Sequence, residues 1–295
     1  IYLILITSGI FGTIIGSFLN VCIHRLPTGY LSIVTPPSHC TCCGKQIAWY
    51  DNIPIFSWIF LGGACRTCRT PISFRYISIE MMTGVLFLFY TYWIMFSSHA
   101  SYASLEFPQK WFALILSVYL IASMIVITFI DFDYRIIPDC LTYPGIIIAP
   151  FISSICPVMH VEIPLIPEKH IAGFVASILG VLVGGGSLYI IGIIGKIVFR
   201  KEAMGLGDVK MMAMVGGFLG GDSAILIFMI ACVFGTVIGI ASYLITKDSY
   251  TPFGPYLALG TLLIIAFKPQ IIEFCFTTWP MMIAKMLGMQ YGYDY

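Results

Sequence analysis

Long apolar runs separated by short polar segments dominate this chain. A run of about 20 apolar residues has the length that an α-helix needs to cross the hydrocarbon core of a bilayer. The run at 111–130 contains no charged residue and is the clearest of these helices. Further membrane helices are predicted at 1–22, 77–97, 140–158, 171–195, 211–221, 223–246 and 253–267. Prolines interrupt 140–158, and 211–221 is too short to cross unless flanking residues contribute.

The predicted fold class is an all-α polytopic membrane protein with about eight transmembrane helices. We expect three parts: a first transmembrane helix at 1–22, a small polar domain at 23–76, and a multi-helix membrane domain at 77–295. The run at 1–22 has no basic region before it and no small-residue cleavage site, which favours an anchor over a removed signal peptide. A last apolar stretch at 271–287 carries charges and a proline, and is predicted to lie at the membrane interface.

Charged residues are scarce in the composition. Only 10% of the 295 residues are charged and 59% are apolar, whereas an ordinary soluble domain has about 25% charged residues. A water-soluble fold has no means of burying so much apolar surface, which excludes soluble globular and disordered proteins. The net charge of +1 gives no indication of a nucleic-acid partner. The partner that the composition indicates is the lipid bilayer.

The few basic residues are concentrated in three polar segments. The 23–76 segment and the 196–210 segment hold most of them, and the short turn at 131–139 holds Arg135. The segments between these carry few basic residues. By the positive-inside rule, the three basic segments face the cytoplasm. Eight crossings would then put both termini outside.

Four of the ten cysteines form two CxxC pairs in the polar domain. Cys40 and Cys43 form the first pair, and Cys65 and Cys68 form the second. Four thiolates on two tight turns provide the tetrahedral sulfur set that zinc accepts, and the cytoplasm disfavours disulfides. We therefore predict a structural zinc site, with Cys43 preferred on spacing over the neighbouring Cys42. The remaining cysteines lie in or beside apolar runs and are predicted to be packing residues: Cys22, Cys140, Cys156, Cys232 and Cys275.

Two aspartates border apolar runs at the predicted cytoplasmic boundary. Asp131 follows the charge-free run, and Asp208 ends a Gly-Leu-Gly-Asp sequence that contains Gly205 and Gly207. Two carboxylates brought together can share one proton, so that one activates water while the other polarises a carbonyl. The glycines would let a substrate backbone approach. Lys210 either extends to the membrane surface or influences the protonation of its neighbours.

The residues alone leave other classes of protein open. Two solvated loop acids would have the same spacing as Asp131 and Asp208. An aspartate pair also fits a transporter of protons or cations, which needs acids deep in the membrane and broken helices. The CxxC pairs also fit a thiol oxidoreductase, provided that they face an oxidising compartment. A non-catalytic assembly scaffold would need neither chemistry.

The motifs as a set resemble those of the type IV prepilin peptidases, the membrane aspartyl proteases of family A24 that serve type IV pili and type II secretion. The resemblance covers nearly the whole chain, and its motifs occur in the family's order. They are Gly16–Val21, Arg25–Pro27, the CxxC pairs around Trp49–Pro54, Arg75–Tyr76 with Glu80, Asp131–Asp139, Glu202–Lys210 and Pro252–Pro255.

This resemblance implies a function and roles for particular residues. Asp131, which opens an Asp-x6-Pro element, and Asp208, the acid of GxGD, would be the catalytic acids. The substrates would be prepilins or pseudopilins, cut after a leader glycine at the cytoplasmic face of the bacterial inner membrane. The new terminal residue would then be N-methylated with S-adenosylmethionine as the methyl donor, although no residue in the sequence indicates where that donor binds. The 23–76 segment would be the zinc-binding cytoplasmic domain of the family.

Overall fold

The computed structural model describes residues 1–29, 32–97, 102–155, 157, 166, 168–200, 204–247 and 252–286. Within these ranges the secondary structure is helical, with only two isolated β-bridges and no named strand. Among the described residues, six helices are long and apolar enough to cross a membrane. These are α1 (Tyr2–Arg25), α3 (Phe74–Phe96), α4 (Phe107–Tyr134), α6 (Lys169–Phe199), α8 (Gly221–Thr246) and α9 (Gly254–Glu273). The predicted class, an all-α polytopic membrane protein, is confirmed.

Two shorter helices account for the difference from the predicted eight crossings. α5 (Asp139–Ile155) contains two prolines, and α7 (Leu206–Leu219) has 14 residues. At 1.5 Å per residue α7 is about 21 Å long, less than the roughly 30 Å of the hydrocarbon core. The chain turns back at Gly220, whose φ of 91° is readily available only to glycine. The run predicted at 211–221 is therefore a helix, but it is too short to cross unaided.

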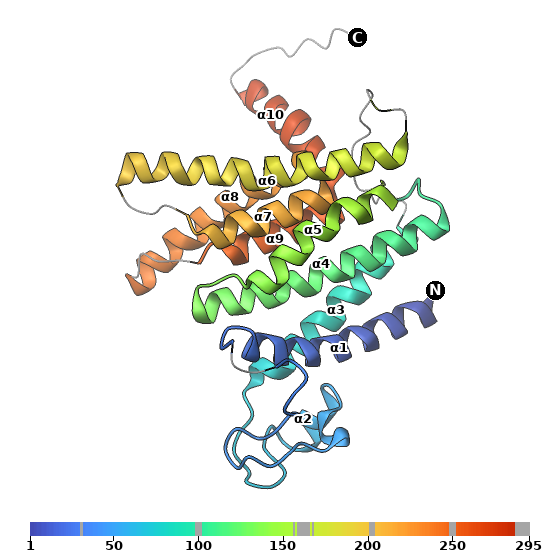
Figure 1. Ribbon diagram of the computed structural model, residues 1–295, viewed down its shortest axis with the longest axis vertical. Coiled ribbons are helices and arrows are strands. Elements are labelled where there is room, and N and C mark those ends of the chain that lie inside the picture. The colour runs from blue at the N-terminus through green and yellow to red at the C-terminus, as the bar shows by residue number, and fades with distance from the viewer. Residues whose placement is uncertain are drawn as a thin grey trace.

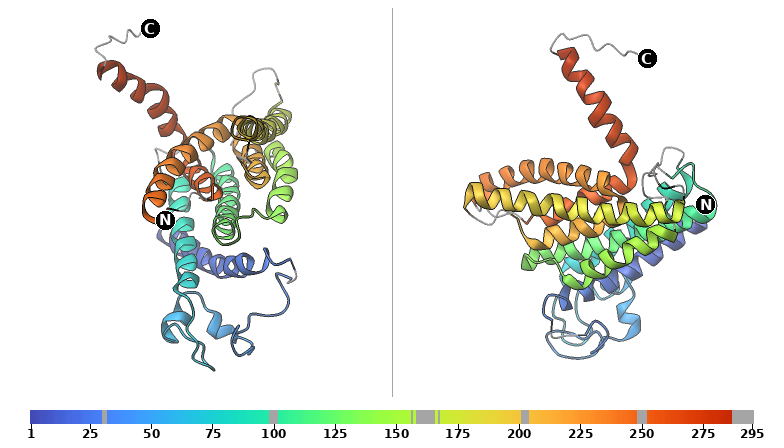
Figure 2. Two further views of the ribbon diagram at one scale, coloured as in Figure 1. Left: turned by 90° about the vertical axis from the view of Figure 1, so that its left-hand side faces the viewer. Right: turned by 45° about the horizontal axis from the view of Figure 1, so that its top comes forward.

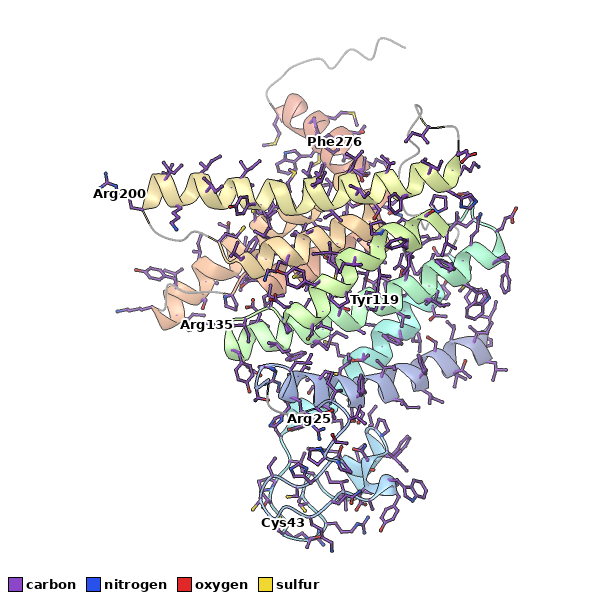
Figure 3. The ribbon with its side chains drawn as sticks, viewed as in Figure 1. Arg25, Cys43, Tyr119, Arg135, Arg200 and Phe276 are labelled. Carbon is purple, nitrogen blue, oxygen red and sulfur yellow. The ribbon has the colours of Figure 1, made fainter. Side chains whose placement is uncertain are left out.

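α4 lies at the centre of the bundle. In the most apolar 18 residues of α4, 67% are buried inside the protein. The corresponding share is 17% in α1 and 22% in both α6 and α8. α1 and α6 lie on opposite sides of it (Figure 1). The three basic segments were predicted to share one side. Arg135 and Arg200 do lie at the same end of the bundle, opposite the N-terminus (Figures 1 and 3).

Glycines bring α1 and α3 into close backbone contact. Gly12 and Gly16 are four residues apart and lie on the face of α1 that meets α3. A Cβ atom on Gly12 would lie 2.8 Å from the Cβ of Phe87, and one on Gly16 would lie 2.8 Å from the Cα of Glu80. Small residues at this spacing let helices approach closely in lipid, where packing and not the exclusion of water drives association.

A second glycine contact joins α6 to α7. A Cβ on Gly180 would collide with the carbonyl of Gly216, and a Cβ on Gly216 would collide with the carbonyl of Gly180. Three consecutive glycines at 184–186 lie in the same helix. Gly184 and Gly185 face α7 at close range, whereas Gly186 faces open space.

Aromatic side chains support a kink in α9. Phe267 has non-helical angles, and Pro269 has no N–H to donate to the carbonyl of Ile265. The hydroxyl of Tyr102 donates to that carbonyl at 3.1 Å, and the indole of Trp93 donates to the carbonyl of Ala266 at 2.6 Å. Backbone groups in lipid must be satisfied inside the protein, and these two bonds meet that requirement at the kink.

Beyond the kink the helix continues and leaves the bundle. A π-helical turn at Phe274–Thr278 leads into α10 (Trp279–Met286), which projects away from the other helices (Figure 2). The sequence predicted that one helix ends at 267 and that a separate apolar stretch begins at 271. In the structure α9 runs through this region and is kinked there. The interfacial position predicted for 271–287 stays a prediction.

A small domain lies between α1 and α3 and contains a 3-10 turn, η1 (Trp49–Asn52), and α2 (Phe56–Phe60). Two buried charged side chains attach it to the bundle. The carboxylate of Glu80 in α3 accepts the N–H of Ile55 at 2.7 Å. The guanidinium of Arg25, at the end of α1, donates to three backbone carbonyls within 32–36.

The α6–α7 contact can be tested with two alanine substitutions in the same helix. Gly180→Ala places a methyl group against the backbone of α7 and should destabilise the protein by about 1–3 kcal/mol. Gly186→Ala meets open space and should be neutral or stabilising by up to about 1 kcal/mol, because alanine favours helix. The measurement is the unfolding midpoint of each variant in detergent. Equal midpoints for the two variants would contradict this view of the contact.

Candidate active site and metal centre

Asp131 lies in the last turn of α4, and only 7% of its surface is exposed. Its Oδ2 accepts the N–H of Gly254, the first residue of α9, at 3.0 Å. A hydrogen bond to a charged group contributes about 1.5–3 kcal/mol, so this bond orients the carboxylate. A Cβ on Gly254 would lie 2.6 Å from the same oxygen. Glycine is therefore the residue that admits the carboxylate at this position.

Asp208 is placed by the local rules of a helix start. α7 begins at Leu206 with Gly205 as its N-cap, so Asp208 is the third helical residue. The Asp208 carboxylate lies beside the N-cap, since a Cβ on Gly205 would lie 3.4 Å from its Oδ2. A negative charge in the first turn also interacts favourably with the helix dipole. The Gly-Leu-Gly-Asp sequence thus determines the position of this acid.

Gly207 has a structural role that differs from the predicted one. A Cβ there would lie 2.9 Å from the Cβ of Ile137, so glycine lets the turn between α4 and α5 approach the start of α7. The glycines of this motif were predicted to admit a substrate backbone. In the structure Gly207 admits a neighbouring segment of the same chain, and the approach of a substrate stays a prediction.

The two predicted acids come from different helices and lie at the same end of the bundle. The negative charge of Asp131 is near enough to interact with Asp208, which is half-buried. Two like charges that interact in this way oppose joint ionisation, which would favour a state with one proton between the two acids. Such a pair can take a proton from water and give one to a leaving group.

Two ion pairs surround these acids, and both were missed by sequence reasoning. Lys210 donates to Asp139 of α5 at 2.8 Å, and the roles predicted for this lysine stay predictions. Arg75, at the start of α3, binds both carboxylate oxygens of Asp133 at 2.9 and 2.6 Å. Asp133 is two residues after Asp131, so this pair connects α3 to the end of α4 beside the acid.

Gly254 lies in Pro252–Pro255, one of the motifs that carry the resemblance, but no role at the site was predicted for it. The available signal was the short Phe-Gly-Pro sequence at 253–255, where a glycine and a proline start a helix. Nothing in that sequence shows that the N–H of Gly254 would donate to Asp131, which is far away along the chain.

The sulfur atoms of Cys40, Cys43, Cys65 and Cys68 all lie within 4.8 Å of one another. The distance between the sulfurs of Cys40 and Cys68 is 3.7 Å. With zinc–sulfur bonds of about 2.3 Å, the edges of a tetrahedral site are about 3.8 Å long. The cluster therefore has the size and the donor set of a site that can hold a metal ion. Cys42 is exposed and lies outside it.

The two CxxC turns share one backbone pattern. The N–H of Cys40 donates to the carbonyl of Lys45, and the N–H of Cys65 donates to that of Thr70, both at 2.9 Å. The residue after the second cysteine is left-handed in each turn, with φ of 69° at Gly44 and 58° at Arg69. Two similar turns thus present two thiols each toward one point.

Thr70 also prepares one of the thiols for metal binding. Hydrogen bonds from Thr70 lower the pKa of Cys68 to about 6, so this group is largely thiolate at neutral pH. The thiolate is the form that binds metal. Of the cysteines predicted to be packing residues, Cys22 is buried, Cys140 is exposed, contrary to that prediction, and Cys156 lies outside the described residues.

Comparison with known proteins bears on both halves of the chain. Residues 10–94 match the bacterial peptidase A24 N-terminal domain, and residues 118–240 match the type IV leader peptidase family. A prepilin leader peptidase/N-methyltransferase of Myxococcus xanthus is 34% identical, with 80% of this chain and 62% of that protein covered. The type 4 prepilin-like proteins leader peptide-processing enzyme of Escherichia coli O78:H11 is 35% identical, with 84% and 88% covered. No solved structure matches.

The metal site can be tested by exchanging two neighbouring cysteines. We expect the purified protein to hold about one zinc ion per chain. Cys43→Ser should sharply lower the bound zinc because it removes a ligand, whereas Cys42→Ser should leave it unchanged. The measurement is elemental analysis of protein prepared without chelators. Acidification should release the metal, because a cysteine thiol must be deprotonated to bind it. The same zinc loss in both variants would contradict the ligand assignment.

Proposed function

Because the chain belongs to the type IV leader peptidase family, we propose that it removes the basic leader from type IV prepilins or pseudopilins. The cut follows the leader glycine, and Asp131 and Asp208 perform it. The observation that carries this proposal is that these two acids, from α4 and α7, lie close enough at one end of the bundle for their charges to interact. The Asp131 carboxylate accepts the N–H of Gly254, and the Asp208 carboxylate lies beside Gly205.

In the proposed reaction the two carboxylates hold one proton between them. The ionised carboxylate takes a proton from a water molecule, which adds to the scissile carbonyl carbon. The protonated carboxylic acid donates a hydrogen bond to the carbonyl oxygen, which carries the developing negative charge. The tetrahedral intermediate then collapses, the carbon–nitrogen bond breaks, and the nitrogen leaves with a proton supplied by the pair. No metal is needed for this chemistry.

The position of the acids fits a substrate that is itself a membrane helix. A prepilin has a short basic leader followed by an apolar helix, which would lie in lipid beside the enzyme. Asp131 and Asp208 lie near the ends of their helices, where the leader would emerge from the bilayer. We infer that this end faces the cytoplasm, since the basic segments gather there, and that the membrane is the bacterial inner membrane.

The second proposed activity is N-methylation of the new terminal residue, with S-adenosylmethionine as the methyl donor. Relatives in Myxococcus xanthus and Neisseria gonorrhoeae carry the name N-methyltransferase. The sequence contains no glycine-rich nucleotide fingerprint, so this half of the proposal rests on those names alone.

We assign zinc a structural role in the domain between α1 and α3. Four cysteine ligands complete a tetrahedral site and leave no position for substrate or water. The metal would cross-link two turns in a segment that has little helix and no named strand among its described residues. Proton or cation transport is less well supported, because the acids lie at helix ends and not at the middle of a span.

The catalytic pair can be tested by removing one charge at a time. Asp131→Asn and Asp208→Asn should each lower the rate of prepilin cleavage by on the order of 10³-fold or more, because the two groups act as a unit. Both variants should remain inserted in the membrane. The measurement is the mass of the products from a purified prepilin, with and without S-adenosylmethionine, so that cleavage and methylation are read separately.

Asp222→Asn provides the matched control for this pair. Asp222 begins α8 and pairs with Lys268, so the exchange removes a carboxylate at a helix start without touching the acids. Normal processing by either catalytic variant, or equal loss in the control, would reject the assignment.

The contact at Gly254 makes a separate prediction. Gly254→Ala introduces a methyl group where the Asp131 oxygen lies and should lower the cleavage rate by about 10²-fold, as expected for a displaced catalytic group. Gly9→Ala in α1 is the control, because its Cβ would lie at an ordinary 3.5 Å from the nearest atom. The measurements are the cleavage rate and the unfolding midpoint. Full activity of Gly254→Ala would show that the carboxylate does not need this position.

A further inference from the structure

The small domain between α1 and α3 exposes a group of large apolar side chains. Trp49 is 80% exposed, Phe56 is 61% exposed and Phe60 is 84% exposed. Ile53 and Ile59 are exposed as well. We call these five residues the aromatic patch. Trp49 belongs to η1, Ile53 follows η1, and the other three belong to α2. η1 and α2 pack against one another, and Phe56, Ile59 and Phe60 share one helix face.

The opposite face of α2 is used inside the domain. Ser57 is buried and donates to the carbonyl of Tyr50 at 2.9 Å. The indole of Trp58 donates to the carbonyl of Ile72 at 3.1 Å. The orientation of α2 is therefore set by internal bonds, and the aromatic patch faces outward as a consequence. A group of exposed apolar side chains of this kind is typical of a site of contact with another molecule or a membrane.

The domain lies beside the membrane helices and not beyond their ends (Figure 1). Glu80, which holds Ile55, is six residues into α3, about 9 Å from the start of that helix. The domain and α1 also line one cavity of about 380 Å³, with Ser17 and Phe18 on one wall and Asn52 and Pro54 on another. Ser17 is eight residues before the end of α1, a depth of about 12 Å.

A bilayer that encloses α1 would also enclose part of the domain. α1 has 24 residues and is about 36 Å long, whereas the hydrocarbon core is about 30 Å thick. A point about 12 Å from the helix end therefore lies at or inside the boundary between headgroups and acyl chains. Tryptophan and tyrosine concentrate at this boundary, and amphipathic segments bury their apolar face there.

The charges of the domain suit the same environment. Residues 32–73 contain Lys45, Arg66 and Arg69 but a single acid, Asp51. Asp51 is paired with Arg66 at 2.6 Å, and Arg66 lies over the ring of Tyr50. A net positive domain is attracted to a leaflet that contains anionic lipid.

We propose that the aromatic patch inserts into the headgroup boundary of the leaflet in which α1 ends, so that the small domain rests on the bilayer. We place the cysteine cluster, which includes Cys43 at the tip of the domain (Figure 3), in the water outside the leaflet. The occupant of the patch is lipid. This inference is independent of the catalytic roles of Asp131 and Asp208.

The test uses the full chain, labelled with fluorotryptophan and reconstituted in phosphatidylethanolamine/phosphatidylglycerol nanodiscs. The fluorine signal of Trp49 is assigned by its loss in Trp49→Phe. The matched control is the signal of an indole introduced by Lys45→Trp, at an exposed position beside the cysteine cluster. Line broadening is measured with a lipid spin-labelled near its headgroup and, separately, with a water-soluble gadolinium chelate. Zinc content establishes that each variant is folded.

We expect the spin-labelled lipid to broaden the Trp49 signal more than the control signal, and the chelate to reverse that order. Broadening of Trp49 by the chelate alone would overturn the proposal, because the patch would then be in water. Protection of Trp49 only after a prepilin is added would also overturn it and assign the patch to the substrate. Insensitivity of Trp49 to both reagents would overturn it in favour of burial against a second copy of the chain.

Discussion

Close contact between helix backbones holds this molecule together, because apolar side chains gain little from one another when their surroundings are lipid. Packing then depends on how near two backbones can come. Gly12 and Gly16 bring α1 against α3, and Gly180 and Gly216 bring α6 against α7. Each contact is sterically intolerant, since an added methyl group would meet backbone or Cβ atoms. The position of every other element depends on these two contacts and on the buried α4 between them.

The candidate site is a consequence of that packing. α7 is too short to cross the bilayer and has little lipid-facing surface, so it is held by α6 and α5. Its first turn presents Asp208, while the last turn of α4 presents Asp131. Gly254 then brings a backbone N–H to Asp131 with no side chain in between. Three helix ends thus supply two acids and a donor, and ends anchored in a rigid bundle hold such groups more accurately than free loops do.

The small domain follows a different physical rule. It has almost no core of its own, and its order depends on a few polar links. Glu80 and Arg25 attach it to the membrane helices, and the four sulfurs gather at its tip. The exposed apolar surface of α2 is unusual for a domain surrounded by water. The same surface is ordinary for a domain that rests against lipid.

Several features were predictable because they depend on local pattern alone. Apolar run length identified α4 and the other long helices, CxxC spacing selected Cys43 over Cys42, and helix-start chemistry explains the place of Asp208. The catalytic roles of Asp131 and Asp208 stay predictions. Tertiary partners decide other outcomes. Gly207 admits Ile137 of its own chain, while its predicted role toward substrate stays a prediction, and Cys140 is exposed although it borders an apolar run.

The amino-acid pattern was enough to establish a membrane protein of long helices, with a four-cysteine domain and acids near helix ends. Run length, spacing and charge are properties of neighbouring residues, and lipid allows few alternatives to a helix. The tertiary structure decided that the residues flanking 211–221 do not lengthen α7 enough for a crossing. It also decided that Gly254 meets Asp131 and that Arg75 binds Asp133. These contacts join segments far apart in the chain, and their geometry depends on how closely whole helices pack.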